Sequence, residues 1–131
     1  MTDSKWGDEK PILIVDDEQD MCWALEQIVR SGGFAARKAL SAQEALCLME
    51  TDSFRGVFLD AKLPDMEGLE LARRIRKIDA QIPVVMVSGY FYRDDVAVQE
   101  ALAGGLITGF IAKPFRRDEI LQAMMSTDSH R

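Results

Sequence analysis

The stretch Ile12-Leu13-Ile14-Val15-Asp16-Asp17-Glu18 (ILIVDDE, residues 12–18) is where the interpretation of this chain begins. Its first four residues are apolar and three of them are β-branched, which is typical of a strand buried on both faces. Three consecutive carboxylates then follow at the point where such a strand ends. Like charges this close repel one another, and the repulsion grows as water is removed. The stretch therefore predicts either a solvated, charged helix start or a site that holds something positive.

The overall composition predicts one soluble globular domain. The chain has 131 residues, of which 47% are hydrophobic and 29% are charged. The formal net charge of -6 argues against non-specific binding of nucleic acid by this chain. No apolar run is long enough to span a bilayer and no signal peptide is recognised, so we expect a cytoplasmic protein without membrane contact. We expect residues 1–10 to form a flexible lead-in, 11–126 the domain and 127–131 a flexible tail.

Cysteine and histidine usage restricts the chemistry further. Cys22 and Cys47 lie in predicted helices without metal-ligand spacing, and we expect both to be reduced, semi-buried thiols. His130 is the only histidine and falls in the predicted tail. This leaves no histidine-based catalytic triad and no histidine-rich metal site.

Short apolar runs alternate with amphipathic segments five times along the chain. The predicted strands are residues 11–15, 34–38, 55–60, 83–88 and 108–112, and the predicted helices are 18–31, 41–51, 66–79, 93–104 and 115–126. Ser41 and Glu44 form a predicted capping box at the second helix. Strict alternation of strand and helix predicts an α/β fold: a doubly wound (βα)5 architecture around a five-stranded parallel sheet.

Polar side chains stand where these strands end. Asp16 and Asp17 follow the first strand, Asp60 the third, Ser88 ends the fourth and Lys113 ends the fifth. Ligands bind outside the carboxyl ends of the strands in open parallel sheets, so these groups are expected to converge. Carboxylate oxygens, a backbone carbonyl and water are the ligands that Mg²⁺ prefers. Such an ion would relieve the carboxylate repulsion and allow Asp60 to attack phosphorus, which points to an aspartyl-phosphate site.

Four motifs in order, ILIVDDE, FLDAKLPDMEG, VVMVSG and FIAKPF, resemble the receiver domains of two-component response regulators. The resemblance covers residues 11–126 and implies the flavodoxin-like receiver fold. It implies that Asp60 is the phosphoacceptor for a histidine kinase, a phosphotransfer protein or a small phosphodonor. Asp17 would bind Mg²⁺ directly, Asp16 directly or through water, and Asp60 and the backbone carbonyl of Lys62 would complete the protein ligands.

The same resemblance assigns the remaining site residues. Ser88 would hydrogen-bond one phosphoryl oxygen and Lys113 would pair with another. Phe110 matches the family's switch position, where an aromatic ring turns inward as the hydroxyl moves. Lys113-Pro114 matches a peptide bond that is usually cis in the family. The resemblance implies a signalling module rather than a conventional enzyme, with a homodimer through the fourth helix, fifth strand and fifth helix as one expected arrangement.

Other interpretations of the same residues remain open. Taken alone, Asp16-Asp17 is typical of the start of a helix, and Ser88 could cap a helix or a turn. Lys113 could be an ordinary exposed lysine, and Phe110 an ordinary core residue. A phosphatase of the haloacid dehalogenase kind also uses Asp, Mg²⁺, Ser or Thr, and Lys, although Ala61-Lys62 lacks its second carboxylate. A flavodoxin-like cofactor binder would need hydroxyls and amides in its first loop, and the three carboxylates present there argue strongly against it. An unphosphorylated interaction domain with a relic site is a third alternative, and whether the chain acts alone or within a larger regulator stays open.

Several residues depart from the family pattern. Trp23 lies off the inward stripe of its helix, and we expect it to contact either a partner or the lead-in. Three adjacent aromatic residues follow Ser88, and at least one is expected to be exposed at the site or toward a partner, namely Tyr90, Phe91 or Tyr92. The segment around Gly104-Gly105 is longer than usual. Lys62 is expected to pair with Asp65 or with the phosphoryl group.

Overall fold

Five parallel strands form one sheet in the computed structural model of this chain, which describes residues 10–91 and 94–128. Their order across the sheet is β2-β1-β3-β4-β5. The strands are β1 (Ile12–Val15), β2 (Ala36–Ala39), β3 (Gly56–Leu59), β4 (Val84–Ser88) and β5 (Gly109–Ala112). The helices are α2 (Gln19–Ser31), α3 (Ala42–Thr51), α4 (Gly68–Ile78), α5 (Val96–Ala103) and α6 (Arg117–Asp128). The predicted alternation and the predicted fold class are confirmed.

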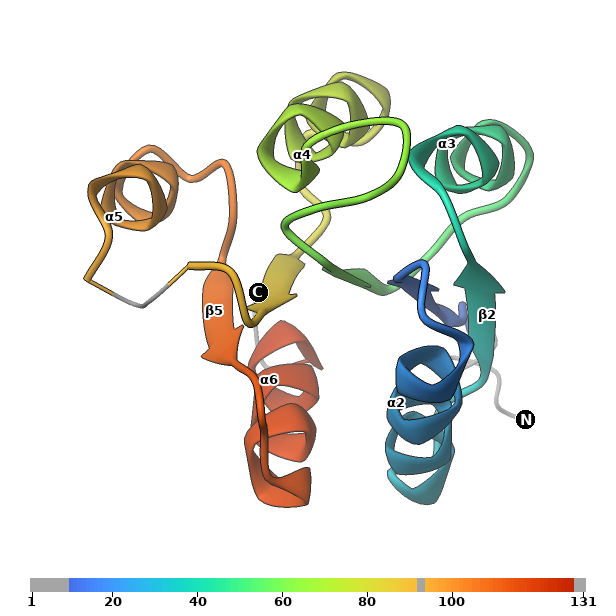
Figure 1. Cartoon of the computed structure of the whole chain (residues 1–131). Helices are drawn as coiled ribbons and strands as arrows, with labels where there is room; N and C mark the ends of the chain where they lie inside the picture. The colour runs from blue at the N-terminus through green and yellow to red at the C-terminus, as the bar shows by residue number, and fades with distance from the viewer. Residues whose placement is uncertain (1–9, 92–93, 129–131) are drawn as a thin grey trace.

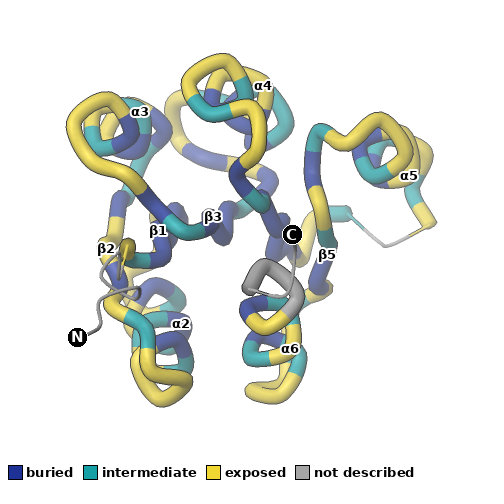
Figure 2. The backbone as a smooth tube through the Cα atoms, turned by 180° about the vertical axis from the view of Figure 1, so that it is seen from behind, coloured by how far each residue is buried: buried dark blue, intermediate teal, exposed yellow. Residues whose placement is uncertain are grey.

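The helices lie on both faces of the sheet, as Figure 1 shows. Helices α3, α4 and α5 cover one face, and α2 and α6 cover the other. The central strands β1, β3 and β4 are therefore buried at every residue, which explains their uninterrupted apolar sequences. Figure 2 shows this buried layer between helices whose outer sides are exposed.

Alternate residues of one strand supply two separate cores. Leu13 and Val15 of β1 belong to the larger core, with residues of α3, α4 and α5. Ile12 and Ile14 belong to the second core, with residues of α2 and α6. Because successive side chains of a strand point to opposite faces, the four apolar residues anchor β1 between both helix layers and so place the residues that follow it.

The second strand begins two residues later than predicted. The end of α2 continues into a cap, in which Gly33 takes a φ of 94° and the Phe34 N–H donates to the Val29 carbonyl over 3.3 Å. A positive φ of this size suits glycine. Residues 32–34 are therefore used to end the helix and are not available to β2.

The connection after α5 is compact in spite of its extra length. Gly105 has a φ of 79°, and the N–H groups of Leu106 and Ile107 both donate to the Ala101 carbonyl, over 2.9 and 3.2 Å. The Arg76 side chain of α4 donates to the Leu106 carbonyl over 3.3 Å. Helix α5 itself begins at Val96, later than the predicted residue 93, which lies outside the described residues.

The two cysteines differ more than the sequence suggested. Both are free thiols, but Cys22 is 1% exposed inside the second core whereas Cys47 is exposed. Helix α3 turns Ala42, Ala45 and Met49 inward, which places residue 47 on its outer side. The expectation that both thiols are semi-buried was wrong.

Candidate functional site

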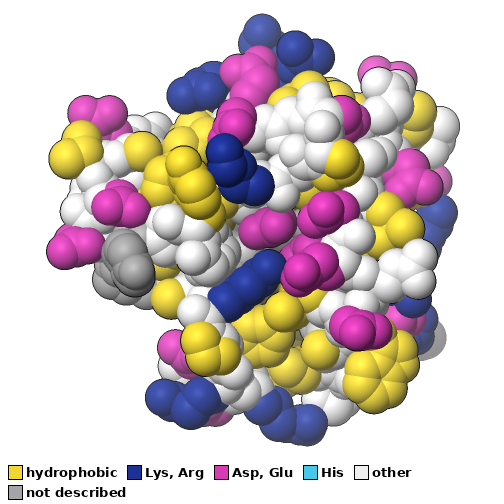
Figure 3. Space-filling view, viewed as in Figure 1, with side chains coloured by type: hydrophobic (Ala, Val, Ile, Leu, Met, Phe, Trp, Pro, Cys, Tyr) yellow, Lys and Arg dark blue, Asp and Glu magenta, His cyan; other side chains and the backbone are white. Residues whose placement is uncertain are grey.

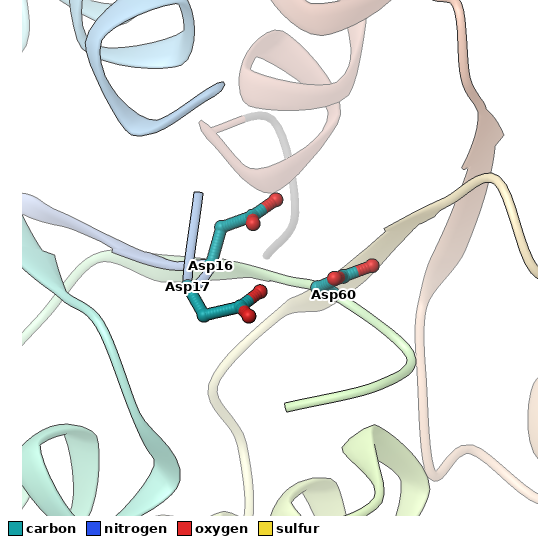
Figure 4. A group of neighbouring side chains, drawn as sticks. All are labelled: Asp16, Asp17 and Asp60. Atoms are coloured by element: carbon teal, nitrogen blue, oxygen red, sulfur yellow. The ribbon is translucent and has the colours of Figure 1, made fainter. Parts of the chain in front are cut away.

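Three carboxylates meet at the carboxyl edge of the sheet. Asp16 and Asp17 follow β1 directly and Asp60 follows β3 directly, and these strands are neighbours with Val15 opposite Leu59. One carboxylate oxygen from each of the three residues lies within 4.8 Å of the other two. Figure 4 shows the two side chains from β1 pointing toward the side on which Asp60 leaves β3. Asp16 is buried, Asp60 is half-buried and Asp17 is exposed.

One ammonium group reaches this cluster from β5. Lys113 Nζ lies 3.0 Å from Asp16 Oδ2 and 3.6 Å from Asp60 Oδ1. The Lys113 N–H donates to the Ser88 carbonyl over 2.9 Å, and the following bond to Pro114 is cis, as the sequence predicted. Figure 3 shows a basic side chain directly beside the acidic group at the centre of this face.

The charges of the site are not balanced. Burial raises the pKa of Asp60, the nearby Lys113 charge acts to lower that pKa, and the Asp16 charge adds to the rise. Burial acts to lower the pKa of Lys113, but its hydrogen bond to Asp16 and the charges of Asp16 and Asp60 together raise it. One ammonium therefore faces three carboxylates, and additional positive charge would stabilise the ionised cluster.

The donor set fits a hard divalent cation. All three cluster members offer oxygen, and no histidine or cysteine side chain belongs to this group within the described residues. One oxygen from each carboxylate lies within 4.8 Å of the other two, so the three residues are near enough to share one ion. The oxygens bound by one Mg²⁺ ion lie closer together than this, so the side chains would have to move toward one another to hold it.

Backbone contacts hold two of the carboxylates in place. The Glu18 N–H donates to Asp16 Oδ1 over 2.9 Å, and the Ala61 N–H donates to Asp60 Oδ1 over the same distance. Gly68 approaches so closely that an added Cβ would lie 2.2 Å from the Asp60 carbonyl oxygen. The backbone carrying Asp60 is thus packed against the start of α4, where only a glycine fits.

The Ser88 hydroxyl is used by the loop that follows it. Ser88 is completely buried, and its Oγ accepts from the Tyr90 N–H over 2.8 Å and from the Phe91 N–H over 3.2 Å. Tyr90 is 58% exposed, while Phe91 is half-buried against the larger core and meets the Tyr90 ring edge-on at 4.9 Å. The expectation that one of the three aromatic residues is exposed holds for Tyr90. Tyr92 lies outside the described residues.

Lys62 has partners other than the predicted one. Its Nζ lies 3.4 Å from Glu67 Oε2 and 4.5 Å from the centre of the Tyr90 ring. Asp65 instead accepts hydrogen bonds from the Ala42 and Gln43 N–H groups of α3, over 2.9 and 3.0 Å. The expected Lys62–Asp65 pair was therefore wrong, because Asp65 caps a helix and Glu67 faces Lys62 across the turn.

Two further predicted residues lie away from the carboxylates. Phe110 of β5 is 2% exposed within the larger core, so its ring points inward. Trp23 is 61% exposed on α2, which agrees with its position off the inward stripe. The role of Asp65 in capping α3 was not predicted from the sequence. The N–H groups that it accepts from, those of Ala42 and Gln43, lie more than 20 residues away, and only the path of the loop after Asp60 brings Asp65 to them.

The comparisons with known proteins identify the family. The sequence model of the family 'Response regulator receiver domain' matches residues 12–125 of this chain. Sporulation initiation phosphotransferase F of Bacillus subtilis (strain 168) is 34% identical over 86% of this chain and 89% of that protein. The C4-dicarboxylate transport transcriptional regulatory protein DctD of Rhizobium meliloti (strain 1021) is 32% identical over 92% of this chain but only 25% of that protein.

A solved structure agrees with this assignment. The crystal structure of a response regulator receiver domain protein (CheY-like) from Methanospirillum hungatei JF-1 superposes on this chain with a TM-score of 0.81 and 28% sequence identity. The superposition covers 93% of this chain and 98% of that chain. These similarities do not favour the phosphatase alternative. Within the described residues, no helix is long and apolar enough to cross a membrane. The chain belongs to the response regulator receiver domains, the phosphorylation-controlled signalling modules of two-component systems.

Proposed function

We propose that Asp60 is the residue that accepts the phosphoryl group in this receiver domain. The observation that carries the proposal is the meeting of Asp60 with two further carboxylates and the Lys113 ammonium at one edge of the sheet. An Asp60 carboxylate oxygen attacks the phosphorus of a phosphohistidine. The new O–P bond forms as the N–P bond breaks, and the electron pair leaves with the imidazole.

Asp16, Asp17, Asp60 and the backbone carbonyl of Lys62 are the groups that would hold Mg²⁺. The bound ion would supply the positive charge that lets an anionic carboxylate approach an anionic phosphoryl group. Lys113 lies close enough to Asp16 and Asp60 to pair with a phosphoryl oxygen on Asp60. The lysine and the metal-binding carboxylates thus have separate tasks in the transfer.

Ser88 and Phe110 are the proposed switch. Ser88 Oγ accepts from the Tyr90 and Phe91 N–H groups, and its O–H would donate to a phosphoryl oxygen. Movement of the hydroxyl toward that oxygen would break the two bonds to the loop. That exchange would rearrange the loop before α5 and alter the surface that partners meet. We infer a histidine kinase or phosphotransfer protein as the donor, a signalling role without conventional turnover, and pairing of two copies through α5, β5 and α6.

Intact mass after incubation with phosphoramidate tests the proposal. We expect the gain of one phosphoryl group in the presence of Mg²⁺, no gain after chelation of the metal, and none in Asp60→Asn. The Glu50→Gln variant changes an exposed carboxylate on α3 and serves as the matched control, with a gain equal to that of the native chain. A gain that persists in Asp60→Asn would overturn the assignment of Asp60.

A further inference from the structure

Trp23 has no role in the folded core. Helix α2 buries Cys22, Leu25 and Val29, and Trp23 lies on another side of the helix with 61% of its surface exposed. More than half of this large aromatic surface stays in water, so its burial contributes little to the stability of the isolated chain. Exposed tryptophan of this kind is enriched where proteins bind partners.

A hollow of about 500 Å³ lies beside Trp23, between the start of α2 and the segment that joins β2 to α3. Its lining combines the less polar Cys22, Trp23 and Leu40 with polar residues. A second hollow of about 400 Å³, lined in part by Glu18, shares Gln19 and Asp20 with the first. The two hollows therefore adjoin at Gln19 and Asp20, and we call the first of them the Trp23 groove.

The Trp23 groove is acidic. Asp20 and Glu44 both line it. Lys38 also lines it, with its Nζ 2.9 Å from Glu26 Oε1, a carboxylate that also pairs with Arg30 over 3.0 Å. Two carboxylates and one ammonium thus line the groove. Figure 3 shows acidic side chains next to a large exposed hydrophobic side chain over α2. The groove therefore presents carboxylates beside an aromatic face.

We infer that the Trp23 groove binds an arginine side chain on a basic segment of a partner protein. A guanidinium is planar, so it can stack on an indole face while its N–H groups donate to carboxylates. A lysine ammonium carries the same charge but cannot do both with one planar group. The groove supplies the two halves of such a contact in Trp23 and Asp20.

This interaction does not depend on the phosphoacceptor site. The test is a titration of the ¹⁵N-labelled full chain with the amidated peptide acetyl-Gly-Arg-Gly-Arg-Gly, with Mg²⁺ at saturation to cover the carboxylate cluster. We expect saturable shifts of the Trp23 indole N–H and of amides 18–23 and 40–44. Trp23→Phe assigns that indole signal, with Trp6 as the second indole. The matched lysine peptide should bind about threefold more weakly.

Variants decide the outcome. Asp20→Asn and Trp23→Leu should each weaken binding of the arginine peptide about threefold or more, whereas Glu50→Gln, an exposed acid outside the groove, should leave it unchanged. Binding is read from Trp23 and Asp20 without phosphorylation, which separates this inference from the proposed phosphoacceptor. Equal binding of both peptides, equal weakening by Glu50→Gln, or shifts centred on Asp16 and Asp60 would overturn the inference. So would concentration-dependent shifts without peptide, which would make a second copy the occupant.

Discussion

At the carboxyl edge of the sheet, the three carboxylates of Asp16, Asp17 and Asp60 outnumber the one nearby ammonium of Lys113. Lys113 is the one ammonium within salt-bridge distance of Asp16 and Asp60 among the described residues, and it reaches both. Asp60 is half-buried and its pKa is raised, first by burial and further by the Asp16 charge. The ionised form of Asp60 therefore opposes folding until a cation arrives.

Replacing Asp60 by Asn should stabilise the metal-free chain. Because the pKa of Asp60 is higher in the folded state than in the unfolded state, its destabilising effect is present above the folded pKa and disappears below the unfolded pKa. We expect the Tm at neutral pH without Mg²⁺ to rise by about 2–5 °C, and the gain to vanish near pH 3. Thermal unfolding measures this, with Glu50→Gln as the control. An equal rise in the control would show a general charge effect instead.

Removing the lysine should have the opposite effect. Lys113→Met leaves the Asp16 side chain, which is 3% exposed, without its 3.0 Å partner. We expect a loss of about 3 kcal/mol in the free energy of unfolding without metal, and partial recovery with Mg²⁺. Urea unfolding provides the measurement. Lys62→Met is the matched control, since Lys62 is exposed and its removal should cost little; similar losses in both variants would contradict the ion-pair account.

The two thiols should react at very different rates. Burial raises the pKa of Cys22 to about 11, and the nearby Asp16 charge adds to this rise. Only about one thousandth of such a thiol is ionised at pH 8. The Cys22 residue is also only 1% exposed, so a reagent has little access to it. Labelling with a disulfide reagent should modify Cys47 quickly and Cys22 only after unfolding. Rapid modification of Cys22, the remaining thiol, in folded Cys47→Ser would contradict this.

Among the secondary-structure elements, α3 is tied to the loop that follows Asp60. Ser41 accepts from the Glu44 N–H over 3.1 Å, and the Glu44 side chain reaches back to the Leu40 N–H over 2.6 Å. Asp65 adds two further acceptors for the N–H groups of Ala42 and Gln43. The predicted capping box is present, with the reciprocal bond one residue earlier than in the usual pattern.

Asp65→Ala should destabilise the fold through this helix end. The hydrogen bonds from Ala42 and Gln43 lower the pKa of Asp65, so its contribution is present above the unfolded pKa and lost as pH falls through the folded pKa. We expect the Tm to fall by a few degrees at pH 7 and by less near pH 3, with partial rescue by Asp65→Asn. A deficit that does not depend on pH would show that the carboxylate charge is irrelevant.

The sequence predicted the elements well where burial alone decides them. The strands β1, β3 and β4 follow from uninterrupted apolar runs. The parallel arrangement brings the ends of β1, β3 and β5 to one edge, which is why Asp16, Asp60 and Lys113 were found. The partner of Lys62 could not be predicted, because it depends on how the turn after β3 closes on itself. The outward position of Cys47 was missed although the inward Ala42, Ala45 and Met49 indicated it.

At the scale of the whole molecule, the fold gathers the polar side chains of the site at the carboxyl edge of the sheet. The two sheet faces are covered by helices, so the carboxyl ends of β1, β3, β4 and β5 are where polar side chains converge. The chain spans 25% of the transcriptional regulator named above and 89% of the phosphotransferase. The segment similar to this chain thus makes up most of one relative and a quarter of the other.

The position of the phosphoryl group is the most direct test of the account. Three carboxylates lie within 4.8 Å of one another, so intact mass alone does not tell which one is modified. Borohydride reduction converts an aspartyl phosphate to homoserine, and peptide mass mapping then finds the residue. We predict homoserine at position 60 alone, in a reaction that requires Mg²⁺. Homoserine at position 16 or 17, or a phosphorylated chain without homoserine at position 60, would contradict the account.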